Sequence, residues 1–363
     1  MMGEDTRPLR MAVGRGAVVN PPNRFERVHA VPDDEQLEAH EASAERYSVA
    51  TEFLPDESKS LLTETDSPDV PFRHSINPYR GCEHGCAYCY ARPYHELLGM
   101  NAGLDFETKI LVKFDAARIL RRELERPSWQ GEVICLSGVT DCYQPAERKF
   151  RITRSILEVL HEARQAVSIT TKNSLILRDL DLLAALAAQR LAQVNMSIPT
   201  LDAELSRVLE PRTATPAARL RAIRELAAAG VPVRVLVAPI IPGLTDHQVP
   251  QVLREAKEAG ALEARYNLLR LPLSVAPVFL HWLQTHRPQL RPKIEQLIRS
   301  TRDGRLNDAT FGDRMVGTGA YAESIRATFL AFATKVGLIG QLPEFDTSLF
   351  RPPRSVSGQL RLF

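Results

Sequence analysis

Three cysteines lie within eight residues of one another, in the segment 81–89. Their spacing is Cys-x3-Cys-x2-Cys. Three thiolates so placed can bind three irons of a cubane iron–sulfur cluster and leave the fourth iron free of protein. An exchangeable ligand can occupy that iron and receive an electron from the cluster. The spacing therefore predicts a 4Fe–4S cluster on Cys82, Cys86 and Cys89, with redox chemistry at its open iron.

A zinc site is the alternative for the same residues. Zinc loops usually combine two cysteines at short spacing with a distant second pair of ligands. No such second pair exists here, and His84 is crowded between Cys82 and Cys86. The iron–sulfur interpretation is favoured, and Gly81 and Gly85 would let the loop wrap closely around a cluster.

The composition is that of a globular protein. The chain has 363 residues, 44% hydrophobic and 25% charged, with a net charge of +2. That balance neither demands nor excludes a polyanionic partner. Five cysteines, an odd number, speak against a disulfide framework. The sequence contains neither a secretory signal nor an apolar run of membrane-spanning length, so we expect no membrane association and a cytoplasmic location.

Six β-rich runs alternate with amphipathic segments from about residue 70 onwards, which predicts a parallel sheet with crossover helices. The predicted strands are His74–Pro78, Val133–Gly138, Ala166–Thr171, Gln193–Ile198, Val233–Ala238 and Ala264–Leu269, with Lys109–Val112 outside the set. The predicted helices between them include Glu147–Ala163, Leu175–Ala188, Pro216–Ala229 and Asp246–Ala259. A complete eight-fold barrel needs two more units, so the fold class is α/β, a partial (β/α)6 TIM-like open barrel.

The order of these segments predicts four parts. Residues 1–65 form an irregular N-terminal arm, and residues 66–300 form the partial barrel. Residues 301–350 form a helical C-terminal extension with a helix at Tyr321–Val336, and residues 351–363 form a flexible tail. The cysteines follow the first barrel strand, at the C-terminal end of the sheet. Ligands bind at that end in parallel α/β folds.

The cluster loop, with Tyr88 just before the last cysteine, resembles the signature of the radical S-adenosylmethionine (SAM) superfamily. Further segments resemble its bacterial DNA-repair-photolyase-like branch, the relatives of spore photoproduct lyase. These segments are 77–93, Gly103–Lys109, Gly14–Ala17, Asn20-Pro21 and Arg24–Glu26. The resemblance implies a lyase- or transferase-like radical SAM enzyme. Such an enzyme cleaves SAM reductively to a 5′-deoxyadenosyl radical, which abstracts hydrogen from a substrate.

Two polar residues that follow successive strands are candidate SAM contacts. By similarity to spore photoproduct lyase, Lys172 would pair with the SAM carboxylate, and Ser197 would reach the ribose. Taken alone, a lysine after a strand is usually a solvated loop charge, and the serine would be a turn residue. Their joint placement at successive strand ends favours the functional interpretation.

Small and apolar residues complete the predicted SAM site. Ser137 and Gly138 form a turn where the methionine amine could approach backbone carbonyls. Pro239 and Ile241 lie in a loop after the fifth strand that would flank the adenine, and Tyr88 would pack there too. A structural turn is the alternative for the proline-rich loop.

The two remaining cysteines invite different interpretations. Cys135 lies inside an apolar strand, where a free cysteine behaves as a small hydrophobe. Cys142 lies near the end of that strand, and we take it as a candidate hydrogen-atom donor to a product radical. Spore photoproduct lyase has a cysteine at the position that Gly138 matches here. This departure puts repair of a thymine dimer in doubt.

The resemblance points to a nucleic-acid base as substrate, in DNA or RNA, for repair or modification. Arginines at 118, 121, 122 and 126 could contact a phosphate backbone, although on a helix face such residues are more often solvated. Radical modification of a peptide or small molecule is the first alternative. A non-catalytic iron–sulfur module recruited to DNA is the second. An enzyme of this type needs an electron donor such as flavodoxin or ferredoxin.

The last five residues resemble the peptide with which bacterial DNA-processing proteins bind the sliding clamp. Leu362 and Phe363 would be the apolar anchors and Gln359 the polar contact. The alternative is a tail that packs on its own core.

Overall fold

A mainly parallel sheet of seven strands forms the centre of the protein. The computed structural model describes residues 14–17, 19–26, 49–340 and 342–353. The strand order is β10-β9-β8-β7-β6-β3-β2, and only β2 runs antiparallel to its neighbour. The strands are β2 (Leu62–Glu64), β3 (His74–Ile76), β6 (Ile134–Leu136), β7 (Val167–Thr171), β8 (Ala192–Ser197), β9 (Val233–Ile240) and β10 (Glu263–Leu268). The six parallel strands are the six predicted barrel strands.

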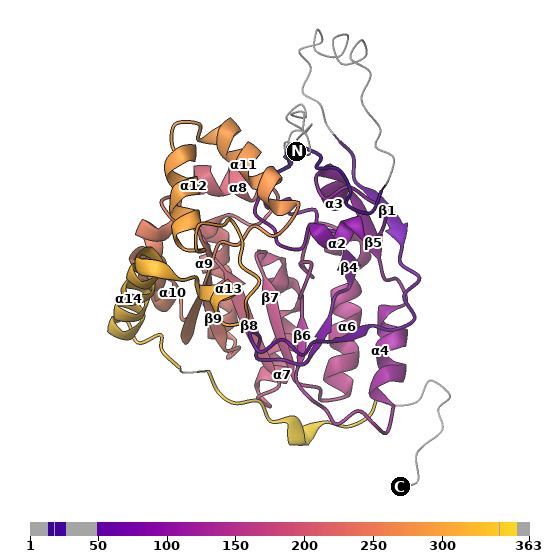
Figure 1. Ribbon diagram of the computed structural model, residues 1–363. Coiled ribbons are helices and arrows are strands. Elements are labelled where there is room, and N and C mark those ends of the chain that lie inside the picture. Colours follow the sequence, from indigo (N-terminus) through magenta and orange to yellow (C-terminus); the bar gives the residue numbers. More distant parts are fainter. Residues whose placement is uncertain (1–13, 18, 27–48, 341, 354–363) are drawn as a thin grey trace, which may run out of the picture.

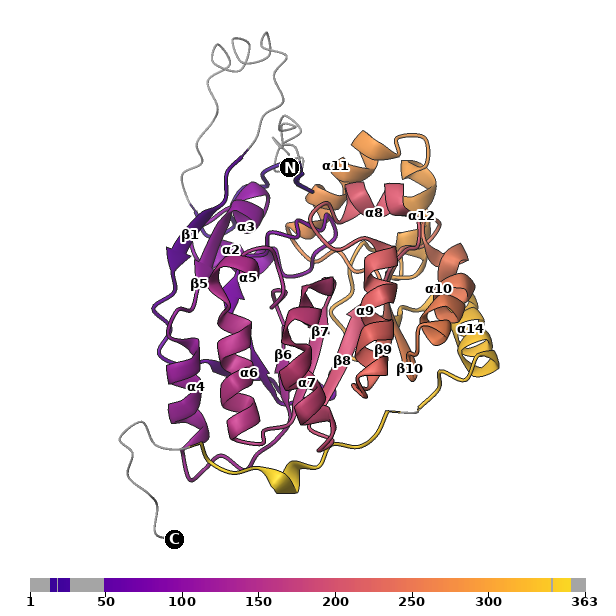
Figure 2. The same ribbon diagram turned by 180° about the vertical axis from the view of Figure 1, so that it is seen from behind.

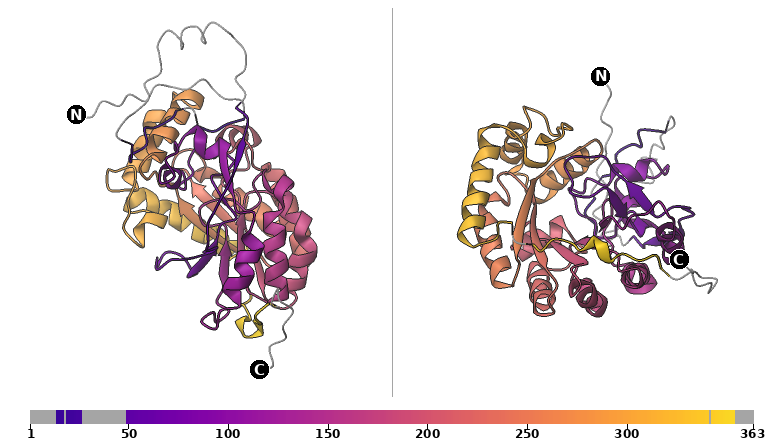
Figure 3. Two further views of the ribbon diagram at one scale, coloured as in Figure 1. Left: turned by 90° about the vertical axis from the view of Figure 1, so that its right-hand side faces the viewer. Right: turned by 90° about the horizontal axis from the view of Figure 1, so that it is seen from below.

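Helices cover one face of this sheet (Figures 1 and 2), and from below they form an arc around its curved strands (Figure 3). They are α4 (Ala116–Leu124), α6 (Ile152–Glu162), α7 (Leu180–Ala187), α9 (Pro216–Ala228), α10 (Val249–Glu258) and α14 (Gly319–Lys335). This arrangement confirms the predicted partial barrel of alternating strands and helices.

Smaller elements gather near the C-terminal ends of the strands. A second sheet has the order β1-β5-β4, formed by β1 (Glu52–Pro55), β5 (Lys109–Val112) and β4 (Tyr79–Arg80). The helices there are α2 (Pro93–Glu96), α3 (Leu104–Thr108), α8 (Ala203–Leu209), α11 (Val275–His286) and α12 (Arg291–Ser300), with α13 (Asp313–Val316) beside β10. Thus β1 and β2 both lie inside the arm that was predicted to be irregular. They are short and gain their order by pairing with β5 and β3.

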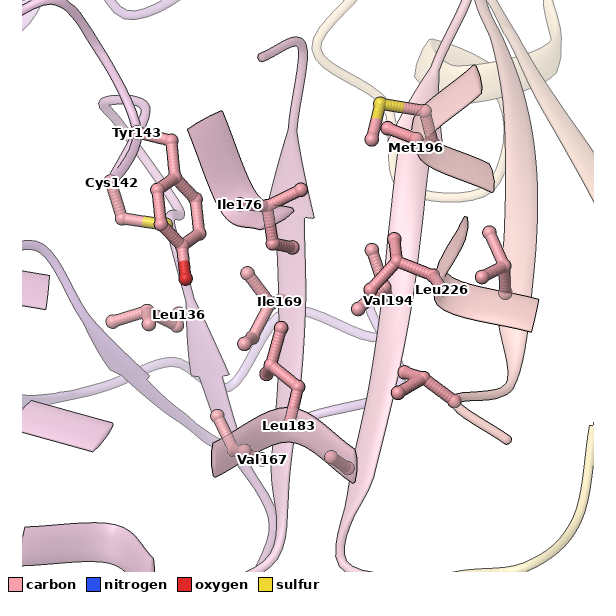
Figure 4. Close-up of a cluster of buried hydrophobic side chains, with 14 of the residues drawn as sticks. Leu136, Cys142, Tyr143, Val167, Ile169, Ile176, Leu183, Val194, Met196 and Leu226 are labelled. Carbon is pink, nitrogen blue, oxygen red and sulfur yellow. The ribbon is translucent and has the colours of Figure 1, made fainter. Parts of the chain in front are cut away.

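The two faces of the large sheet differ in chemistry. Leu136, Val167 and Val194 point into the hydrophobic core with side chains of the covering helices (Figure 4). Because side chains alternate along a strand, their neighbours point to the opposite, inner face. One row in register on that face holds Ser75, Cys135, Ser168 and Gln193. The inner wall of the partial barrel is therefore polar.

A hydrogen-bonded row crosses the same inner face one level nearer the strand ends. Asn195 donates to Thr170 (3.3 Å), and Arg234 donates to Asn195 (2.9 Å). Arg234 also pairs with the buried Glu263 (2.8 Å). These bonds satisfy polar groups that would otherwise be costly to bury inside a sheet.

Three predicted helices are interrupted where they were expected to be continuous. Arg151 has a left-handed backbone (φ 54°) and separates α5 (Glu147–Phe150) from α6. Short 3-10 turns, Ser174–Asp179 and Asp246–Gln248, precede α7 and α10.

Residues 342–353 run back beneath the sheet from α14 towards α4 (Figure 1). Gln193 donates to the carbonyl of Pro343 (2.6 Å), and the amide of Arg351 donates to Ala163 (2.8 Å). Phe350 packs against Gly131 and the main core. This segment therefore ties both halves of the sheet together at its N-terminal edge. No helix within the described ranges is long and apolar enough to cross a membrane.

Candidate active site

The cysteine loop leaves β4 at the C-terminal end of the sheet. Cys82 and Cys86 are buried, Cys89 is partly buried, and all three are free thiols. Burial raises the pKa of each, and the neighbouring cysteines raise the pKa of Cys82 and Cys86 further. Holding three thiolates here therefore requires positive charge, which the irons of a cluster would supply.

A 4Fe–4S cluster and a single metal ion place different demands on the spacing of their ligands. Among the described residues, no three His, Cys, Asp or Glu side chains gather closely enough to hold one metal ion. A cubane presents a different iron to each thiolate. Its ligands therefore stand farther apart than those around zinc.

Buried side chains fix the path of the loop. Gln144 accepts from the amide of Glu83 (2.8 Å) and donates to the carbonyl of Gly81 (3.2 Å). Arg92, fully buried, donates to the carbonyl of Cys86 (2.8 Å) and pairs with Glu107 (2.5 Å). The loop is thus held from both sides before any cofactor binds.

An N-terminal strap, residues 14–17, crosses this loop. The amides of Gly16 and Ala17 donate to the Glu107 carboxylate at 3.0 and 2.8 Å, and Arg15 donates to the Glu107 carbonyl (2.8 Å). A Cβ on Gly16 would lie 1.7 Å from the carbonyl oxygen of Gly85. The close approach of the two backbones requires glycine there. This contact gives a physical role to Gly14–Ala17, one of the segments that resemble the relatives of spore photoproduct lyase.

His84, the alternative zinc ligand, is buried and already engaged. Its Nδ1 lies 3.4 Å from Asp141, and its Nε2 lies 3.1 Å from the Asn173 amide. Burial raises the pKa of Asp141, but His84 and the amides of Lys172 and Tyr143 outweigh that effect and lower it to about 2. His84 therefore connects the cysteine loop to the ends of β6 and β7.

Lys172 follows β7, as predicted, and faces the cysteine loop. Its Nζ lies 6.0 Å from the centre of the Tyr88 ring. Its charge lowers the pKa of Cys86 and Cys89, although burial has the larger, opposite effect. Within the described ranges no carboxylate pairs with this ammonium. An unpaired cation at this position fits an anionic group such as the SAM carboxylate.

The turn at Ser137 and Gly138 is shaped by its own hydrogen bonds. Ser137 has φ 83° and accepts from the amide of Cys142 (2.8 Å). The amide of Gly138 donates to Asn77 (2.8 Å), and its carbonyl accepts from the hydroxyl of Tyr90. The Gly138 carbonyl, considered for the methionine amine, thus already has a donor.

The other predicted SAM contacts cluster around the ends of β8 and β9. Ser197 is buried and donates to the carbonyl of Ala238 (2.8 Å), next to Pro239. Ile241 and Tyr88 belong to one buried apolar cluster with Leu209 and Leu269. The structure therefore brings Ile241 and Tyr88 into one buried apolar cluster, and their contact with SAM stays a prediction.

A buried ion pair supports Tyr88. The Tyr88 hydroxyl donates to Glu210, whose carboxylate pairs with Arg219 at 2.5 Å, both partners fully buried. Arg212, the residue closer in sequence, pairs instead with Glu83 at 3.2 Å. This network anchors the apolar cluster to α9.

The two remaining cysteines occupy opposite faces of the sheet. Cys142 has no exposed surface and lies in the hydrophobic core beside Leu136 and Tyr143 (Figure 4). Cys135 stands on the polar inner wall, in register with Ser75 and Ser168. The Cys142 thiol therefore has no exposed surface, whereas Cys135 lies on the wall of the barrel. The role of Cys142 as a hydrogen-atom donor stays a prediction.

Sequence reasoning overlooked several residues that the fold brings to this site. Gln144, Glu107 and Arg92 hold the loop, and Tyr90 and Arg270 meet at the mouth of the barrel with the Arg270 guanidinium 4.7 Å from the Tyr90 ring. Arg92 and Glu107 lie inside 77–93 and Gly103–Lys109, two of the segments that resemble the lyase branch, so the resemblance could have pointed to them. Nothing in the local sequence marked Arg270.

Residues 76–256 match the Radical SAM superfamily. An uncharacterised protein of Mycobacterium tuberculosis is 41% identical over 244 residues, 66% of this chain and 72% of the relative. One from Methanocaldococcus jannaschii is 28% identical over 238 residues, 66% of this chain and 85% of the relative.

Among solved structures, a spore photoproduct lyase variant with bound AdoMet and dinucleoside spore photoproduct matches with a TM-score of 0.56 at 16% identity over 78% of each chain. A second lyase complex gives 0.55 at 17% identity, covering 78% of this chain and 79% of that one. At such identity the likeness establishes a shared fold. The chain belongs to the radical SAM superfamily, and the two predicted cofactors, a 4Fe–4S cluster and SAM, are those with which this family works.

Proposed function

We propose that this radical SAM enzyme acts on a base in nucleic acid, for repair or modification, with its cluster on Cys82, Cys86 and Cys89. The observation that carries the cluster assignment is that one loop, which faces the unpaired Lys172, holds three free thiols, two of them buried and one partly buried. The nucleic-acid substrate is supported by the fold shared with spore photoproduct lyase, which binds a dinucleoside. When bound, the cluster and SAM supply a 5′-deoxyadenosyl radical that removes hydrogen from the substrate.

The residues of the chain position and enclose these groups. Lys172 binds the SAM carboxylate, and Ile241 and Tyr88 pack beside the adenine together with Pro239. Ser197 shapes the ribose side through its bond to Ala238, and the Ser137–Gly138 turn borders the methionine. The strap on Glu107 keeps water and oxygen away from the loop. Positioning and exclusion of solvent are the protein's main contributions to radical chemistry.

Anaerobic reconstitution tests the cluster assignment. The wild-type chain should show the absorbance and electron paramagnetic resonance of a 4Fe–4S cluster, and replacing all three cysteines by Ala should remove both. Replacing Cys135 by Ala, which leaves the loop intact, is the matched control. A cluster that survives the triple replacement would refute the assignment.

Deuterium transfer tests the substrate class. Reduced enzyme with SAM is incubated with deuterated single-stranded DNA, RNA or peptide, and 5′-deoxyadenosine is examined by mass spectrometry. Label arriving from a nucleic acid supports the proposal, whereas label arriving from the peptide alone overturns it. If 5′-deoxyadenosine forms with none of them, the chain acts on another class of molecule, such as a small metabolite. Flavodoxin and ferredoxin are compared as electron donors in the same assay.

We also propose that Gln359, Leu362 and Phe363 bind the sliding clamp. These residues lie outside the described ranges, so the proposal rests on the sequence pattern alone. A fluorescent peptide of the last residues should bind purified clamp, and Leu362→Ala with Phe363→Ala should abolish binding. Equal binding by the doubly substituted peptide would overturn the proposal.

A further inference from the structure

One arginine at the mouth of the barrel has no ionic partner. The side chain of Arg270, which follows β10, makes no hydrogen bond or ion pair within the described part of the chain. Its guanidinium lies instead over the ring of Tyr90, 4.7 Å from the centre. Tyr90 is 42% exposed, so this cation lies beside open solvent. An arginine held without a counter-ion is available to an anionic ligand.

The Arg270–Tyr90 contact spans the open end of the sheet. Tyr90 follows the last cysteine of the loop and donates to Gly138 beyond the end of β6. Arg270 extends from the end of β10, four strands along the sheet order from β6. The curvature of the sheet brings these ends together, so a ligand at Arg270 would lie at the entrance to the polar interior.

A second arginine–aromatic pair lies next to the first. Arg314 on α13 stacks on Phe311, 4.5 Å from the ring centre, and pairs with Asp69. The buried Arg302 donates to the carbonyls of Leu269 (2.9 Å) and Arg314 (2.9 Å), which fixes α13 against the end of β10. These bonds hold α13, and with it Arg314, against the end of the strand from which Arg270 extends.

Exposed aromatic rings accompany these arginines. Phe311 is 56% exposed and Tyr94, on α2, is 53% exposed. Both α2 and α13 lie on the side of the sheet opposite to α6, α7 and α9 (Figures 1 and 2). The arginine–aromatic rim, defined as Tyr90, Tyr94, Arg270, Phe311 and Arg314, thus surrounds the entrance with rings and cations.

The chemistry of the rim matches a single nucleic-acid strand. Guanidinium groups bind phosphates, and exposed rings stack on bases whatever their sequence. The helix arginines considered from the sequence are less suited than Arg270, because Arg118 pairs with Asp115 (2.6 Å) and Arg121 pairs with Glu162 (2.5 Å). The guanidinium of Arg270 could also bind a peptide, but the exposed rings beside it offer flat faces on which successive bases stack, which favours a nucleic-acid strand.

We propose that the arginine–aromatic rim binds a single-stranded segment of nucleic acid, with a phosphate on Arg270 and bases stacked on Phe311 and Tyr94, and so presents a nucleotide to the barrel interior. This inference rests on the proposed function and specifies where its substrate binds.

Fluorescence anisotropy on the full-length, anaerobically reconstituted enzyme tests the rim. The probe is a labelled DNA strand about 12 nucleotides long, within the range that single-strand-binding folds cover, and affinity is measured over a salt series. Arg270→Gln should weaken binding at least about tenfold. It should also reduce the slope of log K against log salt concentration by about 0.7, the value for one phosphate contact on a single strand.

Two further variants separate charge from stacking. Phe311→Ala should weaken binding about tenfold with an unchanged salt slope, because stacking releases no counter-ions. Arg270→Lys should retain the slope. Arg118→Gln, which removes the same charge from α4, should leave both quantities unchanged. Cluster absorbance and circular dichroism verify that each variant is folded.

The outcomes distinguish failure of the rim proposal from failure of the proposal that the substrate is a nucleic acid. If Arg270→Gln matches the wild type, or if Arg118→Gln has the same effect, the rim proposal is wrong, while label transfer from a nucleic acid would still support the function. If the wild type binds no strand but binds an acidic peptide through Arg270, both proposals fail.

Discussion

The ammonium group of Lys172 faces the cysteine loop without a carboxylate partner among the described residues. Replacing Lys172 by Met should weaken SAM binding about 10- to 100-fold, because a charge-assisted hydrogen bond contributes about 1.5–3 kcal/mol. The cluster spectrum should remain. Isothermal titration with SAM measures the effect, and Lys149→Met, which removes an equal charge beside Phe53 and Phe150, is the control. Unchanged SAM affinity would remove Lys172 from the site.

Cys142 should matter for stability rather than for chemistry, since its thiol is enclosed by the core. Cys142→Ala removes one buried heavy atom and should cost about 1–2 kcal/mol, measured by denaturant unfolding. Label transfer to 5′-deoxyadenosine should continue and product yield should not fall. A stable variant that forms no product would restore Cys142 as the hydrogen donor.

At the scale of single residues, a role could be predicted from the sequence only where the residues that share it are close together in the sequence. The three cysteines are close together in the sequence, so their spacing alone indicated an iron–sulfur cluster. The pair Glu210–Arg219 and the contact Arg270–Tyr90 join residues that only the fold brings together. Arg212 is only two residues from Glu210 but pairs with Glu83, so proximity in sequence does not identify the partner of Glu210.

At the scale of elements, the packing of the strap against the cysteine loop leaves no room for an added methyl group at Gly16. Gly16→Ala places a Cβ 1.7 Å from the Gly85 carbonyl oxygen, so the strap must separate from the loop. We expect the reconstituted cluster to bleach several-fold faster in air, followed by absorbance. Gly99→Ala, where nothing lies within 4 Å, carries only the strain of a left-handed backbone, about 1 kcal/mol. Equal bleaching in both variants would show that the strap does not shield the cluster.

His95 on α2 should make stability depend on pH. Burial lowers the pKa of its ring to about 4 from an ordinary 6.5, and its Nε2 has no partner. The unfolded chain therefore binds a proton first as pH falls, so stability is lost between about pH 6.5 and 4. His95→Phe keeps a ring against Phe106 and should remove that loss, on the order of 3 kcal/mol. Parallel stability curves for both proteins would contradict this assignment.

Strands and helices were predictable where their pattern was regular over several residues. The sequence of β9 is almost continuously apolar, and that of β8 alternates apolar and polar residues, which is a strand pattern as well. Six such parallel strands define the fold. The left-handed break at Arg151 was not predictable, because nothing in the local sequence marks it. The strands β1 and β2 were missed because they are short and form only by pairing with β5 and β3, which lie elsewhere in the sequence.

For the molecule as a whole, the segment beneath the sheet should act as a clasp. A chain ending at residue 340 loses the packing of Phe345, Leu349 and Phe350 on the main core. It should be less stable by about 3 kcal/mol, at roughly 1 kcal/mol for each partly buried side chain. A chain ending at residue 353 keeps these contacts and should unfold like the wild type. Denaturant curves compare the two, and equal midpoints would exclude the clasp.

The position of the strap also bears on how the protein matures. Residues 14–17 leave the ribosome well before the cysteines do, yet in the finished fold they lie across the loop that carries them. We therefore expect iron and sulfide to reach the thiols before the strap binds Glu107. A bulky affinity tag fused directly ahead of residue 14 would lie beside the cysteine loop. We expect such a tag to lower the amount of cluster that the protein takes up.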